Sequence, residues 1–178
     1  MPDSPLDYDF REHNRRNMLK AVALTQQDHG AYLAIYEAIR FSLLEAVEDL
    51  IKSGVDVNER SAVGPYMNFA GMTPLMACYS KKMGELLVKY GADVTARDSE
   101  GRTPLIWFFH TNVYNKSVAR AYLKWLLSVG ADPNDFSRAG DSARELALEM
   151  YGFDLDELYR EAQAKMNPKP KRGKAAEQ

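Results

Sequence analysis

The sequence predicts an all-α solenoid in which repeated helix pairs are joined by projecting fingers. Three glycine-led segments support this class, and each follows an apolar helical pattern: Gly54-Val-Asp-Val-Asn58, Gly91-Ala-Asp-Val-Thr95 and Gly130-Ala-Asp-Pro-Asn134. Three more follow them in turn: Gly71-Met-Thr-Pro-Leu75, Gly101-Arg-Thr-Pro-Leu105 and the weaker Gly140-Asp-Ser-Ala-Arg144. Ten residues separate the paired glycines in the last two cases, so one structural unit is being reused.

Each part of this unit has a physical reason. A glycine after a helix suits the left-handed conformation that other residues reach only with strain. A Thr-Pro pair suits the start of the next helix, because threonine accepts a hydrogen bond from a free backbone N–H and proline there loses no needed donor. The polar, glycine-containing residues between them form a turn or hairpin. The predicted unit is therefore helix, helix, finger.

These paired segments resemble the ankyrin repeat family, which uses Gly-Ala-Asp and Gly-x-Thr-Pro-Leu signals at a period of about 33 residues. The resemblance extends from Gly30 to Gln163, most of the chain. It implies that the segments 73–75 and 103–105 open inner helices, and that Gly91 and Gly130 close outer helices. It also implies a fold of about four helix pairs.

Taken in order, the helix pairs are expected at residues 31–40 and 42–53, 73–79 and 82–90, 103–110 and 116–129, and 142–151 and 154–165. The outer helices are amphipathic, with leucines at helical spacing that should form the core. A leading helix within residues 8–27 should cap the open end of the stack. The expected organisation is a capping region at 1–29, a repeat domain at 30–166 and a disordered basic tail at 167–178.

The sequence also departs from a regular repeat. Seventeen residues separate Gly54 from Gly71, so the first finger carries an insertion around residues 61–70. The insertion contains Tyr66, Met67 and Phe69, which either contact a partner or fold back over the second unit. That second unit is short, and the third is lengthened around residues 111–117, so the fold should be irregular there.

The aromatic run Trp107, Phe108 and Phe109 stands where the family usually has small residues. Consecutive helical positions cannot all face one side, so burial is the preferred interpretation, and Trp107 is the best candidate for any contact outside the core. The resemblance further implies that finger tips and exposed inner-helix positions bind a protein along a concave groove. The candidate contact residues are Tyr66, Met67, Phe69, Met72, Arg97, Ser99, Glu100, Arg102, Trp107, His110, Phe136 and Arg138.

Catalytic and metal-binding interpretations find little support in the sequence. The histidines His13, His29 and His110 lie far apart, and none has a second ligand at metal-site spacing. Cys78 fits a small buried packing position better than a reactive one. Glycines fall in turns and do not form a GxxxxGK[ST] loop, and the carboxylates are scattered. We therefore expect no enzyme activity and no cofactor.

Composition limits the classes of partner and the cellular location that we expect. The formal net charge of -2 gives no overall field that would attract nucleic acid or an anionic membrane. Acidic residues and arginines occupy the N-terminal positions where a secretory signal would be apolar, and no run approaches the length of a membrane span. A single cysteine excludes an intrachain disulfide. A cytoplasmic protein that is monomeric when free is expected.

Two functions fit these observations. In the first, the stack is a dedicated protein-binding module, and a specific form of it is a bacterial immunity protein that neutralises a toxin by occluding its active site. In the second, the stack is a host-directed or regulatory adaptor. There it binds one protein, such as an effector, and the basic residues of 167–178 address a second component or the nucleus.

Overall fold

The computed structural model describes residues 16, 17, 19, 20, 23, 31–61, 71–111 and 113–166. This part of the chain is built from helices joined by turns, with an isolated antiparallel bridge between Phe136 and Ser142. The predicted all-α class is confirmed. The helices are α2 (Ala31–Arg40), α3 (Leu44–Lys52), α4 (Lys81–Lys89), α5 (Pro104–Phe109), α6 (Lys116–Ser128), α7 (Ala143–Tyr151) and α8 (Leu155–Met166).

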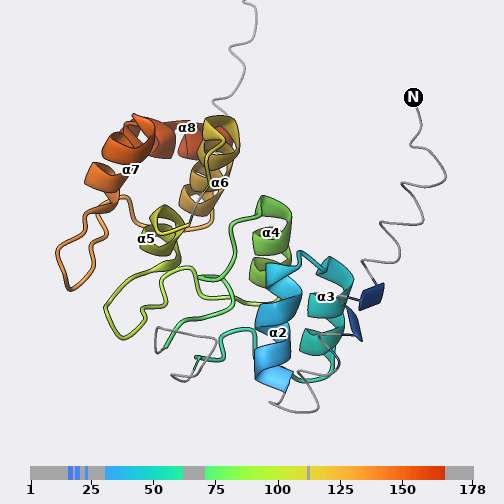
Figure 1. Ribbon diagram of the computed structural model, residues 1–178. Helices are drawn as coiled ribbons and strands as arrows, with labels where there is room; N and C mark the ends of the chain where they lie inside the picture. The colour runs from blue at the N-terminus through green and yellow to red at the C-terminus, as the bar shows by residue number, and fades with distance from the viewer. Residues whose placement is uncertain are drawn as a thin grey trace, which may run out of the picture.

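The helices form two rows. The inner row contains α2, α5 and α7, and the outer row contains α3, α4, α6 and α8. Within the stack α2 packs on α3 and α7 on α8, while α5 meets α7 and α6 meets α8 between successive pairs. Figure 1 shows α2 and α3 at one end of the stack, α7 and α8 at the other, and the finger loops projecting from one side.

Local chemistry explains where these helices begin and end. Thr103 precedes α5 and its side chain accepts a hydrogen bond from the Ile106 amide, with proline at the first helical position. Asn115 and Ser142 cap α6 and α7 in the same way. Gly91 and Gly130, which follow the outer helices α4 and α6, have φ angles of +92° and +112°. The expected roles of these glycines and of the Thr103-Pro104 pair are therefore confirmed.

The second inner helix, expected at residues 73–79, is absent, and that prediction was wrong. Residues 74–77 form only hydrogen-bonded turns, such as the bond from the Met76 amide to the Thr73 carbonyl at 3.0 Å. The reason is length: eight residues separate Thr73 from the start of α4, whereas thirteen separate Thr103 from the start of α6. Too few residues remain for both a helix and a connection, which matches the irregularity expected for this unit.

Neighbouring tyrosines bond backbone carbonyls at the two ends of this short unit. The Tyr36 hydroxyl donates to the Met72 carbonyl at 2.6 Å, and the Tyr122 hydroxyl donates to the Cys78 carbonyl at 2.7 Å. Burial raises the pKa of both tyrosines, so both hydroxyls stay protonated and able to donate. The short unit is therefore held from both sides by the repeats that flank it.

The core lies between the two rows. Phe108 is buried and stacks on Tyr122 with ring centroids 4.9 Å apart, which joins α5 to α6. Between α4 and α6 the approach is closer still, because a Cβ added to Gly84 would lie 2.3 Å from the Trp125 ring. The burial of Phe108, and of Trp107 and Phe109 beside it, agrees with the preferred interpretation of the aromatic run.

Several predictions fall outside the described residues. Residues 16, 17, 19, 20 and 23 are helical, and the rest of the expected capping helix lies outside the part that the structure describes. The same is true of most of the finger insertion, residues 62–70, and of residues 167–178. These stay predictions. Within the described residues, every helix is too short or too polar to traverse a bilayer.

Candidate functional site

The three fingers share one backbone arrangement. We define finger 1 as residues 54–71, finger 2 as 91–101 and finger 3 as 130–140. In each finger a short polar residue stands seven residues after the opening glycine, and it pairs with a second residue across the turn. The backbone amide of the polar residue donates to the carbonyl of its partner, and its side chain accepts a hydrogen bond from the partner's backbone amide. The pairs are Ser61 with Met72, Asp98 with Arg102 and Ser137 with Asp141. Fingers 2 and 3 are thereby closed into tight hairpins, and the same pair of bonds joins the two ends of the insertion in finger 1.

Arginines connect one finger to the next. Six residues after the opening glycine, Arg60 donates to the carbonyls of Gly71 in its own finger and Arg97 in finger 2. Arg97 repeats the pattern, because it donates to Gly101 at 2.7 Å and to Phe136 of finger 3 at 3.1 Å. It also forms an ion pair with the buried carboxylate of Asp135. We call Arg60 and Arg97 the arginine ladder.

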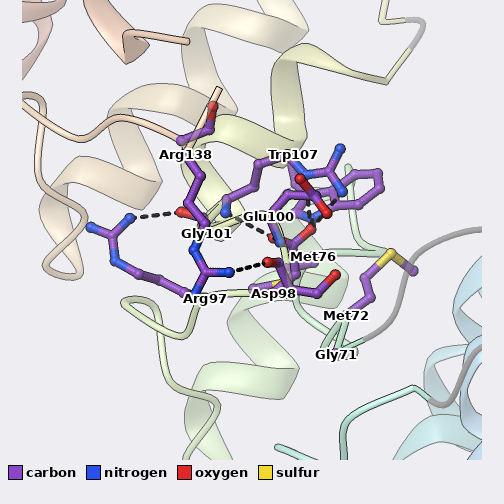
Figure 2. A network of polar contacts seen from close by, with 12 residues as sticks. Gly71, Met72, Met76, Arg97, Asp98, Glu100, Gly101, Trp107 and Arg138 are labelled. Carbon is purple, nitrogen blue, oxygen red and sulfur yellow. Dashed lines mark hydrogen bonds and ion pairs between the residues drawn. The ribbon is translucent and has the colours of Figure 1, made fainter. Parts of the chain in front are cut away.

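Finger 3 also reaches back to finger 2. The Arg138 amide donates to the Glu100 carbonyl at 2.9 Å, and the Arg138 guanidinium donates to the Ser99 carbonyl at 2.8 Å (Figure 2). Gly101 makes this approach possible, because its φ is +73° and a Cβ there would lie 3.0 Å from the Arg138 side chain. The two fingers are therefore locked together in both directions.

Asp98 is the centre of the polar network beneath the tips of these fingers. One carboxylate oxygen accepts from the amides of Glu100 and Arg102 at 2.9 and 2.8 Å. The other accepts from Arg102 Nε at 2.8 Å and from Trp107 Nε1 at 2.9 Å, and it pairs with Arg102 Nη2. The Asp98 side chain is fully buried. Finger 2 is thus fixed to helix α5, from which Trp107 projects (Figure 2).

Contacts of the Trp107 ring connect this network to the surface. The Arg102 guanidinium lies over the Trp107 indole, 4.5 Å from the ring centroid. Trp107 also contacts His110, and the two rings meet edge to face with their centroids 5.9 Å apart. His110 is exposed at the end of α5. A surface residue is therefore held in place by a buried tryptophan.

The structure brings half of the predicted contact residues together on the surface. They lie in fingers 2 and 3 and at the adjoining end of α5, and all are exposed: Arg97, Ser99, Glu100, His110, Phe136 and Arg138. Phe136 is 64% exposed, a large fraction for an aromatic side chain. We call this set the finger surface.

The remaining predicted residues are placed differently. Met72, Arg102 and Trp107 are each only 8% exposed. The expected surface contacts of Met72 and Arg102 are corrected accordingly, and for Trp107 the structure agrees with the preferred interpretation, burial. Arg102 and Trp107 are drawn inward because Asp98 offers their nitrogens a buried carboxylate, and Met72 because its backbone bonds Ser61 and Tyr36. They support the finger surface from below. Tyr66, Met67 and Phe69 lie outside the described residues.

Sequence reasoning missed two residues that organise this surface, Asp98 and Arg60. A signal existed for both. Asp98 and Ser137 each stand three residues before the glycine that precedes the next inner helix, a place where a short polar side chain bonds its own backbone. Arg60 and Arg97 each stand six residues after an opening glycine. Aligning the fingers position by position would have paired them.

Reactive groups are sparse in the described part of the chain. None of its His, Cys, Asp and Glu side chains gather in a group of three that could hold a metal ion. Cys78 is buried, burial raises the pKa of its thiol to about 11, and the thiol donates to the Ser80 carbonyl. A thiol in that state is a poor nucleophile.

Comparison with known proteins bears on the repeats. The family model described as ankyrin repeats, three copies, matches residues 35–137, more than half of the chain. A segment of 75 residues is 39% identical to the ADP-ribosylation factor GTPase-activating protein AGD2 of Arabidopsis thaliana. That segment is 42% of this chain and 9% of the plant protein, so the chain matches less than a tenth of its relative's length.

Proposed function

Because the chain belongs to the ankyrin repeat family, whose members are protein-interaction modules and generally non-catalytic, we propose that it binds a partner protein through the finger surface. The observation that carries this proposal is the gathering of exposed arginine and aromatic side chains over the buried polar network of Asp98, Arg102 and Trp107. Arginine and aromatic residues supply most of the binding energy at protein interfaces. Within that set the Phe136 side chain is exposed, and the Phe136 carbonyl accepts a hydrogen bond from Arg97.

The rigidity of the fingers supports binding by a preformed surface. Arg97 and Arg138 tie fingers 2 and 3 through backbone carbonyls, and the buried Asp98 ties finger 2 to α5. Little conformational entropy is then lost when a partner docks, and more of the contact energy appears as affinity. Charged tips such as Glu100 would contribute mainly to partner choice and association rate.

We further propose that the partner is inhibited by occlusion, as in an immunity protein that neutralises a toxin. A rigid, preorganised surface suits a tight inhibitor, which supports this form of the proposal. Growth of the native host would test it: the chain should rescue cells from a toxin encoded beside its gene, and unchanged killing would contradict the inhibitor role. The GTPase-activating function named for the plant relative is not carried over, because the match covers 9% of that protein.

An adaptor is the second candidate, and the basic, proline-containing composition of residues 167–178 favours it. Deletion of that segment separates the two candidates. An adaptor loses a second partner or its cellular address, whereas an inhibitor that acts through the finger surface keeps its full affinity.

Affinity capture from the native host tests the finger surface directly. The bait is the purified chain, the test variant is Glu100→Lys with Phe136→Ser, and the matched control is Glu85→Lys with Lys89→Glu on the outer helix α4. All four positions are exposed. We expect one protein to bind the wild type and the control and to bind the test variant at least about tenfold more weakly in titration calorimetry. Equal binding by the test variant would reject the finger surface.

A further inference from the structure

Residues 73–80 carry the signals of an inner helix that they do not form. Their opening Thr-Pro-Leu sequence recurs 30 residues later at 103–105, where it begins α5. One turn is already present, because the amides of Met76 and Ala77 both donate to the Thr73 carbonyl, at 3.0 and 3.3 Å. The second of these bonds spans four residues, as in an α-helix. The segment therefore begins a helix and stops after one turn.

The side chain that should cap this helix is unused. Thr73 is 1% exposed, and its hydroxyl has no hydrogen-bond partner within the described part of the chain. The equivalent hydroxyl of Thr103 accepts from the Ile106 amide at the start of α5. A buried hydroxyl without a partner is unfavourable. A helix at residues 74–79 would bring the Met76 amide to the Thr73 hydroxyl and remove that penalty.

Tyr79 is also placed differently from its equivalent in the third unit. It stands 30 residues before Phe109, the last residue of α5. Phe109 is 3% exposed, whereas Tyr79 is 44% exposed. A helix at residues 74–79 would therefore carry Tyr79 to a position that is buried in the third unit, and burial of an aromatic ring is favourable.

The second unit is two residues too short for this helix. The shortest inner helix in the described part of the chain, α5, has six residues. The shortest connections there between an inner and an outer helix have three, residues 41–43 and 152–154. An inner helix with its connection thus needs nine residues, and only the seven residues 74–80 lie between Thr73 and the start of α4 at Lys81.

The first two residues of α4 are held weakly. Ser80 precedes α4, but its side chain caps none of the described amides of that helix. Lys81 and Lys82 follow, and positive charge is unfavourable at the N-terminal end of a helix dipole. The Lys81 pair with Glu85, at 3.4 Å, is half exposed and contributes little. Both lysines are exposed, so releasing them removes no side chain from the core, and the buried Met83 would begin the helix.

We propose that the second unit exchanges between two arrangements. One is the described arrangement, and in the other residues 74–79 form an inner helix while α4 begins at Met83. Release of the two lysines supplies the two missing residues. The exchange gives up the 2.8 Å bond from the Gly84 amide to the Ser80 carbonyl, and it turns the Met76 amide from the Thr73 carbonyl to the Thr73 hydroxyl. The helical arrangement is the less populated of the two.

Both arrangements keep the tyrosine bonds that hold the two ends of the unit. Met72, whose carbonyl accepts from Tyr36, lies before the helix. The Cys78 carbonyl, which accepts from Tyr122, lies in the last helical turn, where carbonyls have no partner within the helix. The exchange therefore takes place between fixed ends, and it withdraws the Tyr79 ring from the surface. A partner that contacts Tyr79 would hold the described arrangement.

Relaxation dispersion of the backbone amides in the full chain tests the proposal. Exchange broadening should appear at residues 74–84 and be absent from α8. Thr73→Val should lower the population of the minor arrangement at least about fivefold, because valine keeps the shape of the side chain and removes the capping acceptor. Thr103→Val is the matched control. It removes a cap that both arrangements use, so it should lower the overall stability and leave the broadening at 74–84 unchanged.

An insertion of Gly-Asn between Ser80 and Lys81 provides a reference for the helical arrangement. It supplies two residues, with glycine after the inner helix and asparagine as the cap of α4. Its Cα chemical shifts at 74–79 should be helical, and their differences from the wild type should match those obtained from the dispersion. Circular dichroism confirms that each variant is folded.

Several results would overturn the proposal. They are flat dispersion at residues 74–84 in the wild type, non-helical shifts in the folded insertion variant, and equal broadening in Thr73→Val and the wild type. An equal loss of broadening in Thr103→Val would also overturn it, because the effect would then not depend on the second unit. If the insertion variant does not fold, the wild type and the two threonine variants decide the matter by themselves.

Discussion

Replacement of Asp98 by asparagine removes one acceptor from the buried network while keeping the shape of the side chain. Each carboxylate oxygen of Asp98 accepts two hydrogen bonds, and the Arg102 guanidinium also forms an ion pair with it. An amide has a single acceptor oxygen. In either orientation of the introduced amide, two of the four donors would face an NH₂ group.

The loss of folding stability in Asp98→Asn comes mainly from the charge that is left without a partner. The Arg102 side chain is 10% exposed, so its charge would remain buried without a neutralising carboxylate. Removing one partner of such a pair costs about 3–5 kcal/mol. Since a folded domain is stable by roughly 5–15 kcal/mol in total, the loss would be a large share of the stability of the chain.

Urea unfolding followed by circular dichroism at neutral pH measures the effect. The matched control is Ser137→Ala, which removes the equivalent side-chain acceptor from finger 3 and takes one donor from the partly exposed Asp141 carboxylate, without leaving a buried charge. The control should cost about 1 kcal/mol. If Asp98→Asn costs no more than Ser137→Ala at an unchanged m-value, the Asp98 network does not hold finger 2, and the support assigned to the finger surface is refuted.

Three further predictions concern the rest of the fold. A Cβ at Gly84 would lie 2.3 Å from the Trp125 ring, so Gly84→Ala should cost about 1–3 kcal/mol in urea unfolding, and an unchanged midpoint would contradict that packing. Because burial raises the pKa of Cys78 to about 11, Ellman's reagent should label the native thiol only as fast as the protein opens, and immediate labelling would disprove its burial. The hydrogen bond from Lys124 lowers the pKa of Glu161, so the unfolded state binds more protons in acid and stability falls as the pH drops through the folded pKa. Glu161→Gln should flatten the decline in Tm between about pH 5 and pH 3, and an identical slope would argue against the pairing.

Repetition made much of the fold predictable. The finger glycines, the Thr-Pro helix start at Thr103 and the amphipathic outer helices each depend on local chemistry that recurs, so their positions could be inferred from sequence alone. The failure at residues 73–79 has a different origin. The Thr73-Pro-Leu75 signal is intact there, but the number of residues before α4 decides whether a helix fits, and local signals carry no information about that length.

The candidate site was predictable only as a region. Exposed and buried residues alternate along finger 2, and all of them are polar, so residue type does not tell them apart. Arg97, Ser99 and Glu100 are exposed, whereas Asp98 and Arg102 are buried. A charged residue enters a protein interior only where an opposite charge and hydrogen bonds receive it, and that partner is supplied by the fold. Asp98 and Arg102 bury one another, which neither residue indicates alone.

Phe136 stands in finger 3 at the position that the arginine ladder occupies in fingers 1 and 2. Arg60 and Arg97 donate to backbone carbonyls, so an arginine at this position is useful wherever another finger follows, whatever side chains that finger carries. At Phe136 the described chain offers no further finger, and an arginine there would have no carbonyl to reach. A position without such a carbonyl could carry any polar residue, yet the residue present is a phenylalanine that is 64% exposed. The exposure of this aromatic side chain supports the proposal that a partner covers it.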